Sequence, residues 1–152
     1  MSAARADDAD DGPSSPMRSP VIARAALVLT ALSTAGVGLV AAFAPRTFYT
    51  DFPYLGHWVD RLPPYNEHLV TDVGGLYLGF ALLLAWAAMT LQRQLVQAAC
   101  AAWILFSVLH AIFHARHLAG FGTADAVAEM VSLVAVIALP LVALWAARLP
   151  SG

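Results

Sequence analysis

The chain contains no lysine and few charged residues of either sign. Its eight basic residues are all arginine, ten residues are acidic, and charged residues make up 12% of the 152 positions, for a formal net charge of −2. A soluble domain carries about 25% charged residues, so this composition is unusual for a water-soluble fold. Basic residues do not outnumber acidic ones, so the chain lacks the positive charge that is typical of a nucleic-acid-binding protein.

Cysteine is nearly absent as well. Cys100 is the one cysteine of the chain, so no disulfide can form within it. The residue lies in an apolar stretch, where a free cysteine acts as a small buried hydrophobic side chain. A fold held together by internal disulfides is therefore excluded.

Apolar residues are abundant. They form 60% of the chain, and the mean hydropathy is +0.70. A helix needs about 20 mainly apolar residues to cross a bilayer. Four such segments occur, at about residues 21–44, 64–89, 98–118 and 124–147. They predict an all-α integral membrane protein, a four-helix transmembrane bundle over residues 20–149, whose main partner is the lipid bilayer.

The first 19 residues differ from the rest. Residues 1–19 hold four aspartates with several serines and prolines and almost no bulky apolar side chain, so we expect a disordered tail. The apolar run that follows is longer than the core of a cleaved signal peptide, which spans about 7–15 residues. We therefore expect it to be retained as the first membrane helix.

The connections carry their own signals. Pro45 is expected to end the first span, and Pro64 to begin the second. Residues 45–66 are rich in aromatic side chains, which favours the headgroup level of the membrane, a loop folded over the bundle, or both. Residues 90–97 are predicted to form a short polar turn before the third span.

Three histidines lie in the third span. His110, His114 and His117 are separated by four and three residues, which places them on one face of a helix. Ionisable side chains at membrane depth are energetically costly and commonly mark functional sites that face the bundle interior. This face is therefore the first candidate for a site.

Chain topology brings other polar residues to the same membrane face. In an antiparallel bundle, the start of the second span, the end of the third and the start of the fourth lie together. The second span contributes Glu67, His68 and Asp72, and the fourth contributes Asp125 and Glu129. With the histidines, these residues predict a polar funnel that narrows toward the middle of the bilayer. The first span adds only hydroxyl groups and is expected to act as scaffold.

Several interpretations of this funnel stay open. The first is a metal site, because histidines and carboxylates from neighbouring helices can bind zinc, iron or copper. Its candidate ligands are His68, Asp72, His110, His114 and Glu129, with Glu67, His117 and Asp125 at the wet rim. A haem held between His68 and a histidine of the third span is a variant of this interpretation.

The alternative is a structural or partner-binding membrane subunit, in which the histidine–carboxylate pairs only stabilise the bundle. A third interpretation is the transport of protons or small solutes, although the polar residues reach only part of the way across. Ser107 lies one turn from His110 but has no hydrolase motif around it. The sequence therefore does not favour an enzyme.

Glycine and arginine positions bear on assembly and orientation. Gly75 and Gly79 form a G-x-x-x-G motif, which predicts close helix packing and a possible face for a homo- or hetero-oligomer. Four arginines near the membrane lie on the side of the two termini and three on the other. By the positive-inside rule this predicts that both termini lie in the cytoplasm. We expect a multi-pass protein of the plasma membrane.

Two segments resemble a known group of proteins. The sequences PYNEHLVTDVGGLYLG (Pro64–Gly79) and HAIFHARH (His110–His117) are similar to those of short four-helix membrane proteins of actinobacteria whose activity is not established. The resemblance covers about residues 20–148. It implies a four-helix membrane fold and assigns no catalytic residue.

Overall fold

The computed structural model describes residues 17–54, 57–62 and 64–148. Four long helices dominate: α1 (Pro20–Phe43), α3 (Glu67–Thr90), α4 (Arg93–Ala115) and α5 (Thr123–Ala146). The short helices are α2 (Pro45–Asp51), η1 (Val59–Arg61) and η2 (Leu118–Gly120). All four long helices are long and apolar enough to cross a membrane. The prediction of an all-α four-helix membrane bundle is confirmed, whereas most of the predicted tail, residues 1–16, lies outside the described residues.

Two helix boundaries differ from the prediction. The second span begins at Glu67, because the side chain of Asn66 accepts a hydrogen bond from the Leu69 amide (3.1 Å) and so caps the helix. Pro64 therefore precedes the helix. The third span begins at Arg93 rather than near residue 98, because arginine and glutamine are good helix formers and extend it toward the membrane surface. Only Leu91 and Gln92 separate α3 from α4.

Pro45 lies at the junction between two helices, α1 and α2. Ala44 leaves the helical region (φ −140°, ψ 57°), and Pro45 is the first residue of α2. A proline is tolerated there, because the first helical position needs no amide hydrogen. The connection predicted as a loop over 45–66 therefore contains two short helices, α2 and η1.

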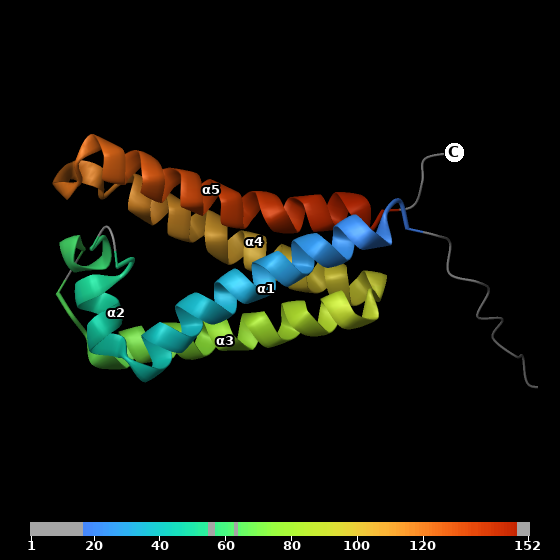
Figure 1. The fold of residues 1–152 in the computed structure, drawn as a ribbon, viewed down its shortest axis with the longest axis horizontal. Coiled ribbons are helices and arrows are strands. Elements are labelled where there is room, and N and C mark those ends of the chain that lie inside the picture. The colour runs from blue at the N-terminus through green and yellow to red at the C-terminus, as the bar shows by residue number, and fades with distance from the viewer. Residues whose placement is uncertain (1–16, 55–56, 63, 149–152) are drawn as a thin grey trace, which may run out of the picture.

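The helices form an antiparallel bundle that is tight at one end and splayed at the other (Figure 1). α1 begins beside the end of α5 and runs diagonally to the start of α3. At the tight end, the amides of Arg18 and Ser19 donate to the carbonyls of Arg148 (2.9 Å) and Ala146 (3.1 Å). The two ends of the described chain therefore lie together. We call this the closed end and the opposite end, beneath α2, the open end.

Small side chains build the core of the closed end. Leu27, Leu84, Val96 and Cys100 are fully buried there, together with alanines from all four long helices: Ala23, Ala26, Ala87, Ala99, Ala143 and Ala146. Alanine lets helix backbones approach closely, which is how membrane helices gain packing energy without a hydrophobic effect between them. The burial of Cys100 confirms its predicted role as a small hydrophobic residue.

The close approach of α1 and α3 depends on a glycine that the sequence motif did not single out. A Cβ atom on Gly74 would lie 2.3 Å from the Ala42 nitrogen of α1, whereas one on Gly75 or Gly79 would meet nothing within 4 Å. Within the chain, the predicted role of Gly75 and Gly79 in helix packing is therefore wrong. The face that carries them points away from the bundle, and its use in an oligomer stays a prediction.

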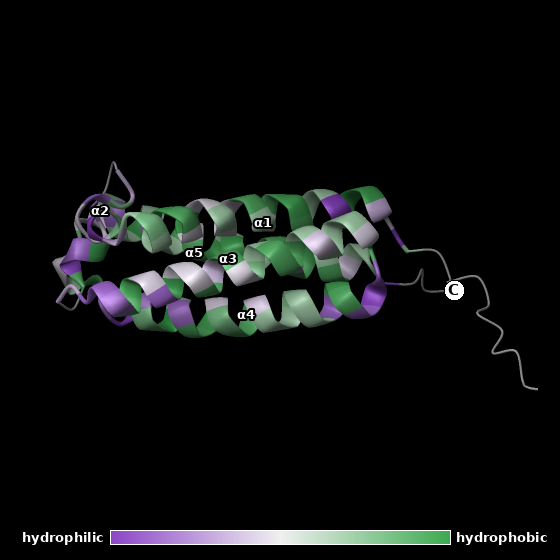
Figure 2. Ribbon diagram, turned by 90° about the horizontal axis from the view of Figure 1, so that it is seen from below, coloured by the Kyte–Doolittle hydropathy of each residue, from purple (hydrophilic) through white to green (hydrophobic). Residues whose placement is uncertain are grey.

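The outer surface matches a lipid environment (Figure 2). Hydrophobic residues cover the long helices along their length, and hydrophilic residues collect near the two ends. Large apolar side chains point outward on every long helix; examples are Leu32 (65% exposed), Leu82 (71%), Leu105 (65%) and Val131 (62%). Such a surface is stable in lipid and unfavourable in water.

Candidate functional site

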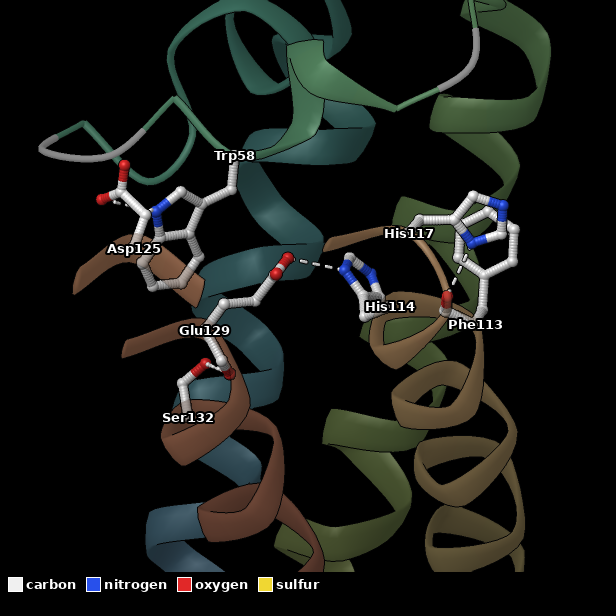
Figure 3. Close-up of polar contacts among 7 residues, drawn as sticks. All are labelled: Trp58, Phe113, His114, His117, Asp125, Glu129 and Ser132. Atoms are coloured by element: carbon white, nitrogen blue, oxygen red, sulfur yellow. Dashed lines mark hydrogen bonds and ion pairs between the residues drawn. The ribbon is translucent and has the colours of Figure 1, made fainter. Parts of the chain in front are cut away.

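A buried histidine–carboxylate pair joins α4 to α5 near the open end (Figure 3). His114 Nδ1 lies 2.6 Å from Glu129 Oε1, and the two side chains are only 10% and 3% exposed. With Nδ1 protonated, the imidazole donates to the carboxylate. At this depth lipid offers no competing partner, so the pair holds the two helices together.

Two buried oxygen atoms near this pair lack a partner. Among the described residues, neither Glu129 Oε2 nor Ser107 Oγ makes a hydrogen bond, although both atoms are buried. Ser107 itself is 1% exposed and Glu129 2%. A buried polar atom without a partner costs about 1–3 kcal/mol, and more when it is charged. These two atoms are therefore the places where a bound molecule would gain most from a hydrogen bond.

Both residues line a cavity of about 440 Å³ between the splayed helices. The volume is in the range of about 300–1,000 Å³ found for small-molecule sites. All four long helices contribute to its wall, as does the connection between α1 and α3. The lining is mostly apolar. Apart from the hydroxyl of Tyr77 and the indole N–H groups of Trp58 and Trp103, its polar members are Ser33, Thr34, Ser107, His110, His114, Glu129 and Ser132.

Aromatic rings form the wall of the cavity toward α3 and α4. Tyr77 of α3 meets Trp103 and Phe106 of α4 edge to face, with ring centroids 5.4 Å apart in both cases. His110 stacks on Phe106 at 5.6 Å, and its ring centroid lies 4.4 Å from that of His114. Aromatic contacts of this kind stabilise the wall and present flat apolar surface to the cavity.

The connection between α1 and α3 covers the cavity. We call its described residues, Pro45–Tyr54 and His57–Leu62, the cap. Phe48, Phe52 and Trp58 of the cap line the cavity from above. Of the two placements predicted for this aromatic segment, the loop folded over the bundle is therefore confirmed for these residues.

Asp125, at the start of α5, fastens the cap. Its carboxylate accepts a hydrogen bond from Trp58 Nε1 (3.4 Å, Figure 3) and forms an ion pair with Arg61 (3.3 Å). Arg61 also donates to the carbonyl of Gly120 (3.4 Å), and its guanidinium lies 5.0 Å from the centroid of the Phe121 ring. Asp125, which the sequence predicted to lie at the rim of the funnel, thus holds the cap on the α4–α5 side.

Only part of the predicted funnel comes together. His110, His114 and Glu129 line one cavity. His68 and Asp72 instead bond to each other (3.2 Å) on the outer surface of α3, where their side chains are 87% and 60% exposed. α3 is therefore rotated about its axis relative to the orientation that the sequence predicted. Because neighbouring residues are about 100° apart on a helix, such a rotation changes which residues face the cavity.

That rotation turns a different face of α3 toward the cavity. Val73 and Tyr77 line the cavity from α3, and Gly74 lies against α1. The stripe of His68, Asp72, Gly75 and Gly79 consequently faces outward. A valine and a largely buried tyrosine thus stand where the sequence predicted a wall of ionisable residues.

The remaining rim residues lie at the surface. His117 follows the end of α4, and its Nδ1 lies 2.7 Å from the carbonyl oxygen of Phe113 (Figure 3). Glu67, in the first turn of α3, accepts a hydrogen bond from the hydroxyl of Tyr65 (3.3 Å). Both are exposed, in keeping with the predicted rim, and neither reaches the cavity.

The metal and haem interpretations gain no support from this geometry. Within the described part of the chain, no group of three or more His, Cys, Asp and Glu side chains is placed to hold a metal ion. His68, the proposed haem partner of a third-span histidine, is on the outer face of α3. His114 Nδ1 and Glu129 Oε1 face each other and are already engaged in their mutual hydrogen bond.

The sequence did not indicate the contribution of α1. Ser33, Thr34 and Val37 line the cavity, so α1 is part of the site and not scaffold alone. The Thr34 hydroxyl donates to the Thr30 carbonyl of its own helix (2.6 Å), which satisfies its donor and leaves a mainly apolar wall. The hydroxyl groups of α1 were visible in the sequence, but the diagonal course of the helix that brings Ser33 and Thr34 to the cavity was not.

No protein-family model matches the chain, and neither the characterised proteins nor the solved structures contain a detectable relative. The site must therefore be interpreted from its own chemistry.

Proposed function

We propose that this multi-pass membrane protein binds one small, mainly apolar molecule in the cavity of its open end, through a group that donates a hydrogen bond to Glu129. One observation carries the proposal. The Glu129 Oε2 atom is buried beside the cavity without a partner among the described residues. A ligand donor would satisfy that oxygen and remove its desolvation cost.

The walls define the rest of the ligand. Phe106, Trp103 and Tyr77 offer aromatic surface, which favours a ring or a short branched chain. The Ser107 hydroxyl, also without a described partner, can donate or accept. A lipophilic alcohol, phenol or amine has the required combination of an apolar body and one O–H or N–H group.

The test measures ligand binding to purified protein in nanodiscs. Small molecules that copurify are extracted and identified by mass spectrometry, and a panel of phenols, alcohols and amines is screened by thermal stabilisation. Glu129→Gln keeps an acceptor for His114 but places an amide N–H₂ where the free oxygen was. We expect affinity for donor ligands to fall by about tenfold or more in this variant, the equivalent of one good hydrogen bond.

Glu67→Gln is the matched control, because Glu67 is an exposed carboxylate at the same end of the bundle. It should leave ligand affinity unchanged. If no molecule copurifies or stabilises the protein, or if both variants bind equally well, the binding proposal is wrong. In that case the alternative of a structural subunit, stabilised by the His114–Glu129 pair, accounts for the site.

The same preparation tests the other interpretations. Protein purified without a nickel column is assayed for zinc, iron and copper and for a haem absorption band, which the metal interpretation requires. The transport interpretation is disfavoured by the closed end, whose buried core is made of apolar side chains among the described residues. It requires flux in liposomes that His114→Ala abolishes.

We also propose that the protein resides in the plasma membrane with its closed end in the cytoplasm. Arg18, Arg24, Arg93 and Arg148 belong to that end, against three arginines at the open end, and the arginine bias sets orientation. Reporter fusions at each terminus test this. The outward Gly75–Gly79 face is the surface through which we expect any oligomer to form.

A further inference from the structure

A second hollow lies on the outer surface of the bundle at the closed end. It is a groove of about 440 Å³ between α1 and α3, lined by Arg24, Val28, Ala31, Leu32, Ala85 and Met89. Apart from Arg24, these side chains are apolar. We infer that this groove binds one anionic phospholipid, with its phosphate at Arg24 and an acyl chain along the groove. The inference is independent of the proposed ligand of the open end.

The shape of the groove follows from side-chain size. Ala31, Ala85 and Ala88 are small and leave room between the two helices, whereas the larger Leu32 and Met89, which also line the groove, are 65% and 71% exposed. A lipid chain in this hollow would make van der Waals contacts along both sides, which a flat helix surface does not offer. The groove therefore suits a single extended hydrocarbon chain.

Arg24 provides a fixed cation at the head of the groove. Its Nε donates to the carbonyl of Ala88 (3.0 Å), one of the last four carbonyls of α3, which have no partner within the helix. Among the described residues, Arg24 makes no other hydrogen bond and no ion pair. Its two terminal N–H₂ groups are therefore available for a phosphate, which arginine binds well.

The depth of Arg24 matches a headgroup. Arg24 is four residues into α1, which begins at Pro20, so its Cα lies about 6 Å along the helix axis. Arginine side chains near helix ends extend toward the membrane surface. The guanidinium therefore sits at the level of the lipid phosphates, with the apolar groove below it.

Charge at the closed end favours an anion. Its four arginines are accompanied by no acidic side chain in the described part of the chain, since the six described carboxylates are Asp51, Asp60, Glu67, Asp72, Asp125 and Glu129, of the other half. The acidic segment of residues 1–16 is the other anion attached to this end, but it has no leucine, isoleucine, valine or aromatic residue. Its apolar side chains are those of Met1, alanines and prolines, which match a long apolar groove less well than an acyl chain does, so a lipid fits better.

The experiment measures retained lipid by native mass spectrometry. The full chain is exchanged into detergent containing equal amounts of phosphatidylglycerol and phosphatidylcholine with identical acyl chains. We expect one phosphatidylglycerol to be retained in preference, and Arg24→Gln to lower that preference about fivefold or more. Glutamine can still donate to the Ala88 carbonyl, and a thermal unfolding curve confirms that the variant is folded.

Control variants distinguish the effect of the Arg24 charge on lipid binding from the effect of the open groove. Arg116→Gln removes the same charge from an exposed site at the open end and should leave the preference intact. Ala85→Leu fills the groove without changing charge and should lower retention of both lipids, whereas Ala101→Leu, on an exposed face of α4, should not. The inference is overturned if both lipids are retained equally, if Arg116→Gln acts like Arg24→Gln, or if Ala85→Leu has no effect.

Discussion

The closed and open ends of this bundle are made by the same four helices but are packed in different ways. At the closed end, alanines from all four helices are buried together with Leu84, Val96 and Cys100. At the open end, the α1–α3 and α4–α5 pairs diverge (Figure 1), and the space between them is a cavity under the cap. Side-chain size decides the difference, because small residues bring helices together and rings hold them apart.

The two ends also differ in what holds them. At the closed end, small apolar side chains pack the helix interior, and the polar contacts are donated to backbone carbonyls by the Arg18 and Ser19 amides and by Arg24 Nε. At the open end, the helices are joined by a few polar contacts: His114 with Glu129, and Asp125 with the cap. A binding site needs such an arrangement, because a fully packed core leaves no room for a ligand.

The largest expected effect comes from a pair of leucines, one at each end. Leu84 is fully buried in the closed core, and Leu133, 8% exposed, lines the cavity. Leu84→Ala should cost about 3 kcal/mol of unfolding free energy and Leu133→Ala about 1 kcal/mol, because a side chain beside an existing cavity has fewer contacts to lose. Reversible unfolding in mixed micelles measures both values. Equal losses would contradict the contrast between the two ends.

The next effect tests the contact of α1 with α3. Gly74→Ala places a Cβ atom 2.3 Å from the Ala42 nitrogen and should cost about 2 kcal/mol through forced separation of the helices. Gly75→Ala is the neighbouring control, with open space around its Cβ. It should be neutral or stabilising by up to about 1 kcal/mol, since alanine favours helix more than glycine. Thermal unfolding of the two variants should therefore shift in opposite directions or differ clearly in size.

A third prediction compares two histidine–carboxylate pairs. His114→Ala removes the described partner of the buried Glu129 and should destabilise the protein by about 1–3 kcal/mol. His68→Ala breaks the exposed pair with Asp72 and should cost less than about 0.5 kcal/mol. The same unfolding assay applies. A similar cost for both variants would mean that burial does not distinguish the pairs.

The smallest effect concerns the cap. Asp125→Asn removes the ion pair with Arg61, whose side chain is 30% exposed, and Asn can still accept from Trp58. We expect a loss of about 0.5 kcal/mol, seen as roughly twofold faster hydrogen exchange over the cap. Asp60→Asn, an exposed residue of η1, should leave exchange unchanged. Uniform exchange in all three proteins would show that Asp125 does not hold the cap.

Sequence patterns located the polar end of the molecule better than they located the site. The convergence of His110, His114 and Glu129 follows from topology and helical spacing, and the structure places them on one cavity. The failure at His68 and Asp72 has a physical cause. In a bilayer both the lipid-facing and the inward-facing sides of a helix are apolar, so the sequence of α3 does not say which side a polar stripe takes near the membrane surface.

The sequence by itself determined that this chain forms four apolar helices, where they run to within a few residues, and which end carries its ionisable groups, because helix length, hydropathy and chain direction suffice for these. Tertiary structure decided the rotation of α3, the glycine that contacts α1, the part of α1 in the site and the cavity itself. These depend on which small side chains meet across helix pairs, and such contacts join residues far apart in the chain.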